Sequence, residues 1–72
     1  MPTNADRAAW AWEACETFAD ATGLGVADEL PTVIGDLIAN LLHLADREGL
    51  CAESILGTAR MHFEAELEEE IA

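Results

Sequence analysis

Lysine is absent from this 72-residue sequence, and arginine occurs only three times. Fifteen aspartates and glutamates leave a formal net charge of −12. Such an imbalance repels phosphates and therefore disfavours direct binding to nucleic acid. It favours a basic partner, including a protein that itself binds nucleic acid, unless the acidity only keeps a small protein soluble. A chain of this length allows one acidic domain over residues 1–72.

Cysteine and long apolar runs are also scarce. The two cysteines, Cys15 and Cys51, are too few for a disulfide framework and fit no metal-binding spacing. No apolar stretch approaches the ~18 residues of a membrane span. The N-terminus lacks the basic and apolar regions of a signal peptide. We therefore expect a cytoplasmic protein with reduced thiols, no membrane contact and no cofactor.

Apolar residues in the middle of the chain recur with the period of an α-helix. Their stripe consists of Leu30, Val33, Ile34, Leu37, Ile38, Leu41, Leu42, Leu44 and Ala45. It covers about half of the helix circumference. Because one neighbour cannot cover so wide a stripe, we expect this helix to be buried between two others.

Capping and helix-breaking residues divide the chain into three predicted helices, which span residues 4–22, 29–48 and 52–70. Thr3 or Asn4 is expected to cap the first helix, and Gly23 to end it. Asp28 is the predicted N-cap of the second helix, and Gly49 its stop. Short connections between the helices indicate an all-α fold, a compact antiparallel three-helix bundle.

Residues 33–67 include the hairpin sequence IGDLIANLLHLADREGLCAESILGTARMHFEAEL. This stretch resembles the second half of the MazG-like all-α nucleotide pyrophosphatases. That family binds magnesium through an E-x-x-E pair on one helix and an E-x-x-D pair on the next. The resemblance implies Glu13 and Glu16 as the first pair and Asp36 as the end of the second. Val33 departs from the pattern, because it stands where the second pair needs its glutamate.

The size, charge and helicity of the chain also resemble those of small acidic helical proteins of phages and plasmids. Some of these, including certain anti-CRISPR proteins, mimic nucleic acid with rows of carboxylates. The resemblance predicts a non-enzymatic inhibitor or decoy that occupies the basic nucleic-acid-binding surface of a partner protein. The predicted partner-binding residues are Glu13, Glu16, Asp20, Glu64, Glu66, Glu68 and Glu69. The alternatives are an active or degenerate MazG-like hydrolase and a small homodimeric structural protein.

Two large apolar residues lie off the predicted core faces of their helices. They are Trp10 on the first helix and Met61 on the third. Fully burying one such side chain contributes roughly 1.5–3 kcal/mol. Trp10 and Met61 are therefore the predicted contact residues of a possible homodimer.

The charge imbalance predicts that salt stabilises the fold. Raising sodium chloride from 10 to 150 mM shortens the Debye length from roughly 30 to 8 Å and so screens repulsion among the carboxylates. The melting temperature, followed by circular dichroism, should rise over this range, and potassium chloride should produce the same rise. A melting temperature that falls steadily would show that favourable ion pairs dominate.

Overall fold

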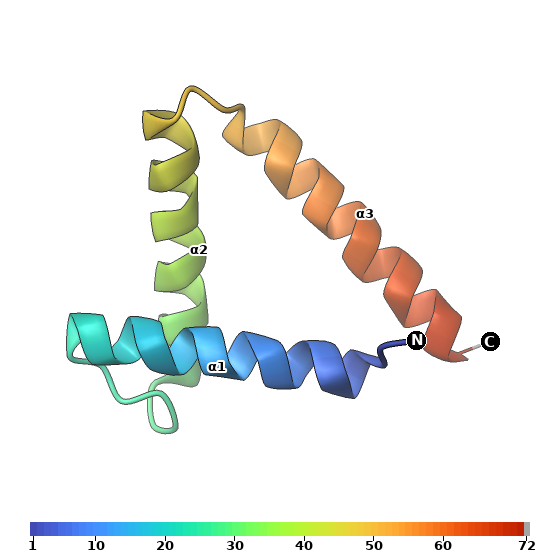
Figure 1. The fold of residues 1–72 in the computed structure, drawn as a ribbon, viewed down its shortest axis with the longest axis horizontal. Coiled ribbons are helices and arrows are strands. Elements are labelled where there is room, and N and C mark those ends of the chain that lie inside the picture. Colours follow the sequence, from blue (N-terminus) through green and yellow to red (C-terminus); the bar gives the residue numbers. More distant parts are fainter. Residues whose placement is uncertain (72) are drawn as a thin grey trace.

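The computed structural model describes residues 1–71, which form three α-helices. They are α1 (Asn4–Thr22), α2 (Leu30–Arg47) and α3 (Ala52–Ile71). No strand occurs within residues 1–71, and no helix there has the length and apolarity needed to cross a bilayer. The predicted all-α class and the three helices are confirmed, with boundaries within one residue of those predicted. The helices form the sides of an open triangle (Figure 1).

Local hydrogen bonds determine where α1 begins and where the chain turns into α2. The Thr3 hydroxyl accepts from the Asp6 backbone at 3.1 Å, and the Thr3 backbone donates to the Asp6 carboxylate at 2.9 Å. This reciprocal pair is a capping box. The prediction of Asp28 as the cap of α2 is wrong: Glu29 is the N-cap and makes no side-chain capping bond. The Glu29 carboxylate instead accepts from the Gly25 backbone at 2.9 Å, which stabilises the preceding loop.

Glycines end α1 and α2 in the left-handed conformation, as predicted. Gly23 has a φ of 77° and Gly49 a φ of 72°. Side chains with a Cβ atom adopt such angles at a cost, so glycine suits both positions. After Gly49, the Leu50 backbone donates to the Ala45 carbonyl at 2.8 Å. This bond reverses the chain into α3.

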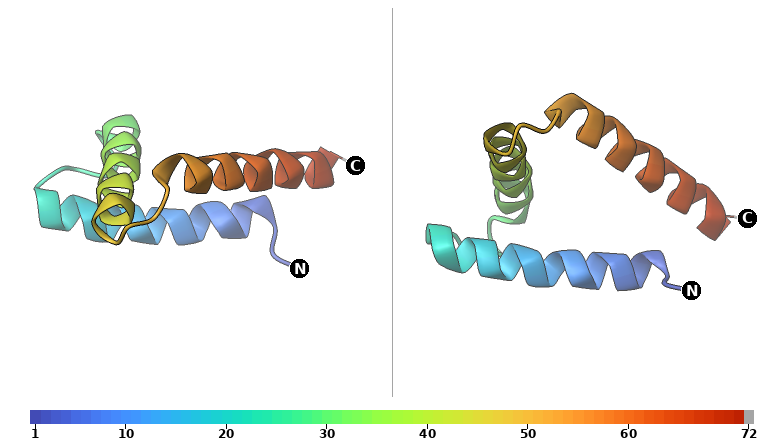
Figure 2. Two further views of the ribbon diagram at one scale, coloured as in Figure 1. Left: turned by 90° about the horizontal axis from the view of Figure 1, so that it is seen from above. Right: turned by 45° about the horizontal axis from the view of Figure 1, so that its top comes forward.

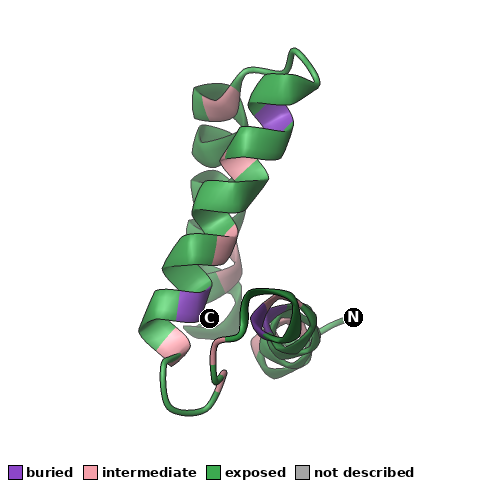
Figure 3. Ribbon diagram, turned by 90° about the vertical axis from the view of Figure 1, so that its left-hand side faces the viewer, coloured by how far each residue is buried: buried purple, intermediate pink, exposed green. Residues whose placement is uncertain are grey.

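The buried core is small and lies where α1 crosses the start of α2 (Figures 1 and 3). Cys15 and Ala19 of α1 pack with Val33 of α2, and Val33 is fully buried. The small side chains on α1 allow the two helix backbones to approach closely. Phe18 and Leu37 lie partly buried against this cluster.

The expectation that α2 is buried on two sides is wrong for the single chain. Only Val33 and Ala45 of α2 are buried. Other members of its apolar stripe are 44% to 56% exposed; they are Ile34, Ile38, Leu41 and Leu44. The cause is the arrangement of the neighbours, because α1 crosses one end of α2 while α3 diverges from the other (Figure 2).

A polar cluster joins the end of α3 to the start of α1, at the third corner of the triangle. Arg7 Nε lies 3.0 Å from Glu66 Oε2. Asn4 donates from its side chain to the Glu66 carbonyl at 3.0 Å and from its backbone to Glu70 Oε1 at 2.7 Å. The first N–H groups of a helix lack intrahelical acceptors and carry partial positive charge. The Glu70 carboxylate therefore satisfies one of these groups in α1.

The overall shape is more open than that of a close-packed bundle. The radius of gyration is 13.7 Å, whereas a compact chain of this length has about 11 Å. The α-carbon trace extends over 39 × 32 × 18 Å. The three-helix arrangement is thus present, but the helices meet near their ends and leave their apolar faces partly uncovered.

Because Val33 is the one large side chain within residues 1–71 that is fully buried, truncating it should destabilise the fold most clearly. Val33→Ala removes two methyl groups and should lower the free energy of unfolding by about 2 kcal/mol. The neighbouring Thr32 is exposed, so Thr32→Ala is the matched control and should change stability by less than ~0.5 kcal/mol. Urea titrations measure both values. Equal stability of the two variants would contradict the position of the core.

Candidate functional site

Carboxylates dominate the outer surface of the molecule. Every aspartate and glutamate except Glu66 is exposed. Two of the three guanidinium groups lie beside the chain's own carboxylates: Arg7 pairs with Glu66 at 3.0 Å and Arg60 with Glu64 at 3.8 Å. The surface presented to other molecules is therefore strongly negative.

The acids predicted on α1 form a row along one side of that helix. Glu13, Glu16 and Asp20 follow at spacings of three and four residues, and all three are exposed. At about 100° per residue, they lie roughly 180–240° around α1 from Arg7. Arg7 contacts α3, so the row points away from the closed corner of the triangle. Its axial length is about 10 Å at 1.5 Å per residue.

The acids predicted on α3 have different surroundings from one another. Glu66 is partly buried in the contact with α1, where it supports the fold. Glu64 forms a long, exposed pair with Arg60 one turn away. Glu68 and Glu69 are exposed on the last turns of the helix. Of the four predicted residues, Glu64, Glu68 and Glu69 therefore remain on the outer surface.

The predicted acids thus form two groups, not one continuous surface. The α1 row lies in the second half of α1, towards the crossing with α2. The α3 group lies where α3 approaches the first turn of α1, near both chain ends (Figure 1). A partner that contacts both groups must extend along most of α1.

The residues implied as magnesium ligands are not assembled into a site. Within residues 1–71, no group of three or more His, Cys, Asp or Glu side chains is arranged to hold a metal ion. Glu13, Glu16 and Asp36 are all exposed, the first two on α1 and the third on α2. The hydrolase alternative therefore has no metal centre within the described part of a single chain.

Trp10 and Met61 are both exposed, on different helices. Trp10 of α1 is 57% exposed and Met61 of α3 is 72% exposed. Their exposure is consistent with their predicted positions off the core faces. Their role in self-association stays a prediction.

An apolar groove between α1 and α2 is a hollow feature that the sequence interpretation missed. It has a volume of about 420 Å³. Its lining consists of Ala8, Ala11, Trp12, Ala14, Cys15, Leu30, Ile34, Leu37, Ile38 and Leu41. None of these residues is charged or polar apart from the thiol. The α2 members of this lining were expected to be buried between two helices, and the width of the α2 stripe already indicated that more than one neighbour was needed to cover it.

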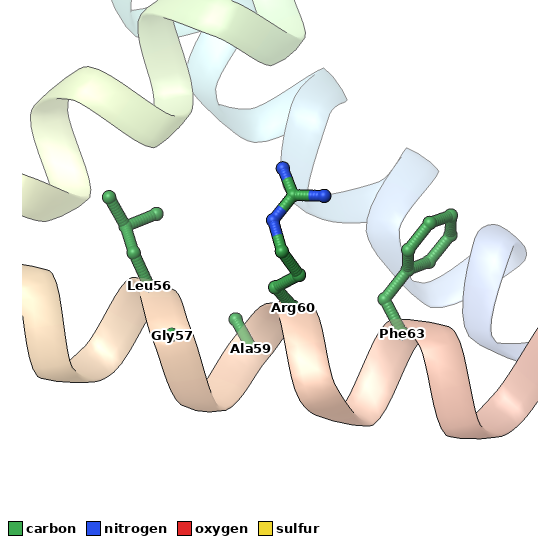
Figure 4. Close-up of a pocket in the computed structure, with 5 residues that line it drawn as sticks. All are labelled: Leu56, Gly57, Ala59, Arg60 and Phe63. Atoms are coloured by element: carbon green, nitrogen blue, oxygen red, sulfur yellow. The ribbon is translucent and has the colours of Figure 1, made fainter.

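A second hollow, of about 390 Å³, lies along α3. Its lining consists of Leu56, Gly57, Ala59, Arg60 and Phe63. Figure 4 shows that Leu56, Arg60 and Phe63 extend from the same side of the helix. Phe63 is 58% exposed there. Both α2 and α3 therefore present large apolar side chains to solvent.

The two thiols should differ sharply in reactivity. Cys15 is buried and Cys51 is exposed, and both are free. Access controls thiol reactions, so an aromatic disulfide reagent should modify one thiol per native chain rapidly and the other slowly. Cys51→Ser should abolish the fast phase, whereas Cys15→Ser should leave it unchanged. Two fast thiols in the native protein would contradict the burial of Cys15.

Comparisons with protein-family models, with curated proteins and with solved structures find no match to this chain. The two resemblances drawn from the sequence therefore remain predictions. The proposed function rests on the geometry, burial and charge of the chain's own residues.

Proposed function

We propose that this chain is a non-enzymatic acidic binding protein, an inhibitor or decoy that occupies the basic nucleic-acid-binding surface of a partner protein. The observation that carries the proposal is the exposure of every carboxylate except Glu66, on a chain of net charge −12. A surface of one sign steers an oppositely charged partner towards it and accelerates association. The proposal places the protein in the cytoplasm, where free thiols stay reduced.

The α1 row supports mimicry of a phosphate backbone. Successive residues of the row, Glu13, Glu16 and Asp20, are separated by axial rises of about 4.5 and 6 Å. Phosphates along one strand of B-DNA are about 3.4 Å apart along the helix axis. The carboxylate spacing thus lies between one and two phosphate steps. A basic groove shaped for phosphates can therefore contact successive carboxylates.

The row also lies on a rigid element. The capping box at Thr3 stabilises the start of α1, and Cys15 and Ala19 anchor another side of the helix to α2. Acids carried by a folded helix lose little conformational freedom when they bind, in contrast to acids on a disordered tail. The arrangement therefore favours recognition of one basic surface over diffuse attraction to many.

The test begins with capture of partners from the source cell at low salt and purification of the captured protein. The partner should be basic, bind nucleic acid by itself, and lose that nucleic acid when this chain is added. Each exposed ion pair contributes about 0.2–1 kcal/mol. Glu13→Gln/Glu16→Gln/Asp20→Asn should therefore weaken binding by about 3- to 150-fold.

A matched variant distinguishes the effect of the α1 row on binding from the effect of the net charge. Asp28→Asn/Asp36→Asn/Asp46→Asn removes the same number of charges from exposed positions outside the two acidic groups. This control should bind nearly as the parent does. Equal weakening by both variants would contradict the role of the α1 row. A captured partner that keeps its nucleic acid in the complex would overturn the decoy function.

A further inference from the structure

The single chain exposes more surface than a folded monomer of its mass. Its solvent-accessible area is 5677 Å² for 7.7 kDa. Folded monomers of that mass expose about 4,300 Å². The excess is therefore about 1,300 Å² per chain, beyond the ~800 Å² per partner that a standard protein interface buries.

The excess includes apolar surface on all three helices. Trp12 on α1 is 39% exposed, Leu41 on α2 is 53% exposed and Phe63 on α3 is 58% exposed. Trp12 and Leu41 lie together in the groove between α1 and α2. An apolar helix stripe is stable when another element covers it. Residues 1–71 form three helices, and none of them covers this groove.

We propose that a second copy of this chain covers the α1–α2 groove, and that the protein is a homodimer built on that face. Two copies that each bury the excess remove about 2,600 Å² in total, within the range of obligate homodimers. Ile34, Ile38 and Leu41 are the exposed apolar residues that α2 contributes to this groove. A two-fold interface pairs the same patch of both copies, so these side chains can pack against the same face of the partner.

Charge distribution permits this pairing in spite of the net charge of −12 on each copy. The groove lining contains no aspartate, glutamate or arginine. The acidic row of α1 is exposed outside that lining. Two copies can therefore join their apolar faces while their carboxylates remain in water. The inference does not rest on the proposed decoy function, because it concerns the uncharged face of the molecule.

Sedimentation equilibrium at 100 μM in 150 mM sodium chloride tests the assembly. The expected mass is twice 7.7 kDa. Leu41→Asp puts a charge into the groove and should raise the dimer dissociation constant by about 30-fold or more, as loss of a hot-spot residue does. Met61→Asp is the matched control, because it places the same charge at an exposed position on another helix, outside the groove. It should leave the dimer intact, whereas the alternative interface through Trp10 and Met61, predicted from the sequence, would be disrupted by it.

Tryptophan fluorescence locates the interface without disrupting it. The chain has two tryptophans. Trp10→Phe leaves only Trp12, whose emission should shift to longer wavelength as the dimer dissociates on dilution. Trp12→Phe leaves only Trp10, whose emission should not change. This fluorescence measurement locates the interface even if the Leu41→Asp variant fails to fold.

Three results would overturn the inference. The first is a single-chain mass for the parent protein at 100 μM. The second is a dimer that survives Leu41→Asp but dissociates with Met61→Asp, which would place the interface on the outer side of α3. The third is an emission shift confined to Trp10. If an unrelated protein occupies the groove instead, the purified chain stays monomeric and sedimentation equilibrium gives the mass of one chain.

Discussion

The structure depends on one constraint: the three helices carry more apolar surface than their arrangement buries. The main buried cluster lies at the crossing of α1 with α2, where Cys15, Ala19 and Val33 are in contact. Small residues on α1 make that contact possible. Elsewhere the helices meet near their ends, and the stripes of α2 and α3 remain half-exposed. The open shape therefore follows from helix length and crossing geometry together.

Charge and apolarity occupy different sides of α1. The row of Glu13, Glu16 and Asp20 lies on the outer side, while Trp12 and Cys15 face the groove. A helix with this division can contact an apolar element on one side and a basic surface on the other. The acidic binding surface and the proposed dimer face are thus compatible within one assembly. Two-fold symmetry would present the acidic row twice.

The helices could be predicted from sequence because their ends depend on local chemistry. Thr3 with Asp6, Gly23 and Gly49 act within a few residues of their own positions. The crossing angles could not be predicted, because they depend on contacts between residues far apart in sequence. The same limit explains why the apolar stripe of α2 was assigned to a closed core. It also explains why the acids of α1 and α3 were not separated into two groups.

Glu66 stabilises the fold, although its charge suggested a role in binding a partner. It was predicted as a partner-binding acid, yet at about 100° per residue it lies on the same side of α3 as Phe63 and Ala59. A carboxylate within an apolar stripe is costly to bury without a partner. Arg7 supplies that partner at 3.0 Å. This corner is therefore closed by polar groups, and the apolar groove that the proposed dimer covers lies elsewhere, between α1 and α2.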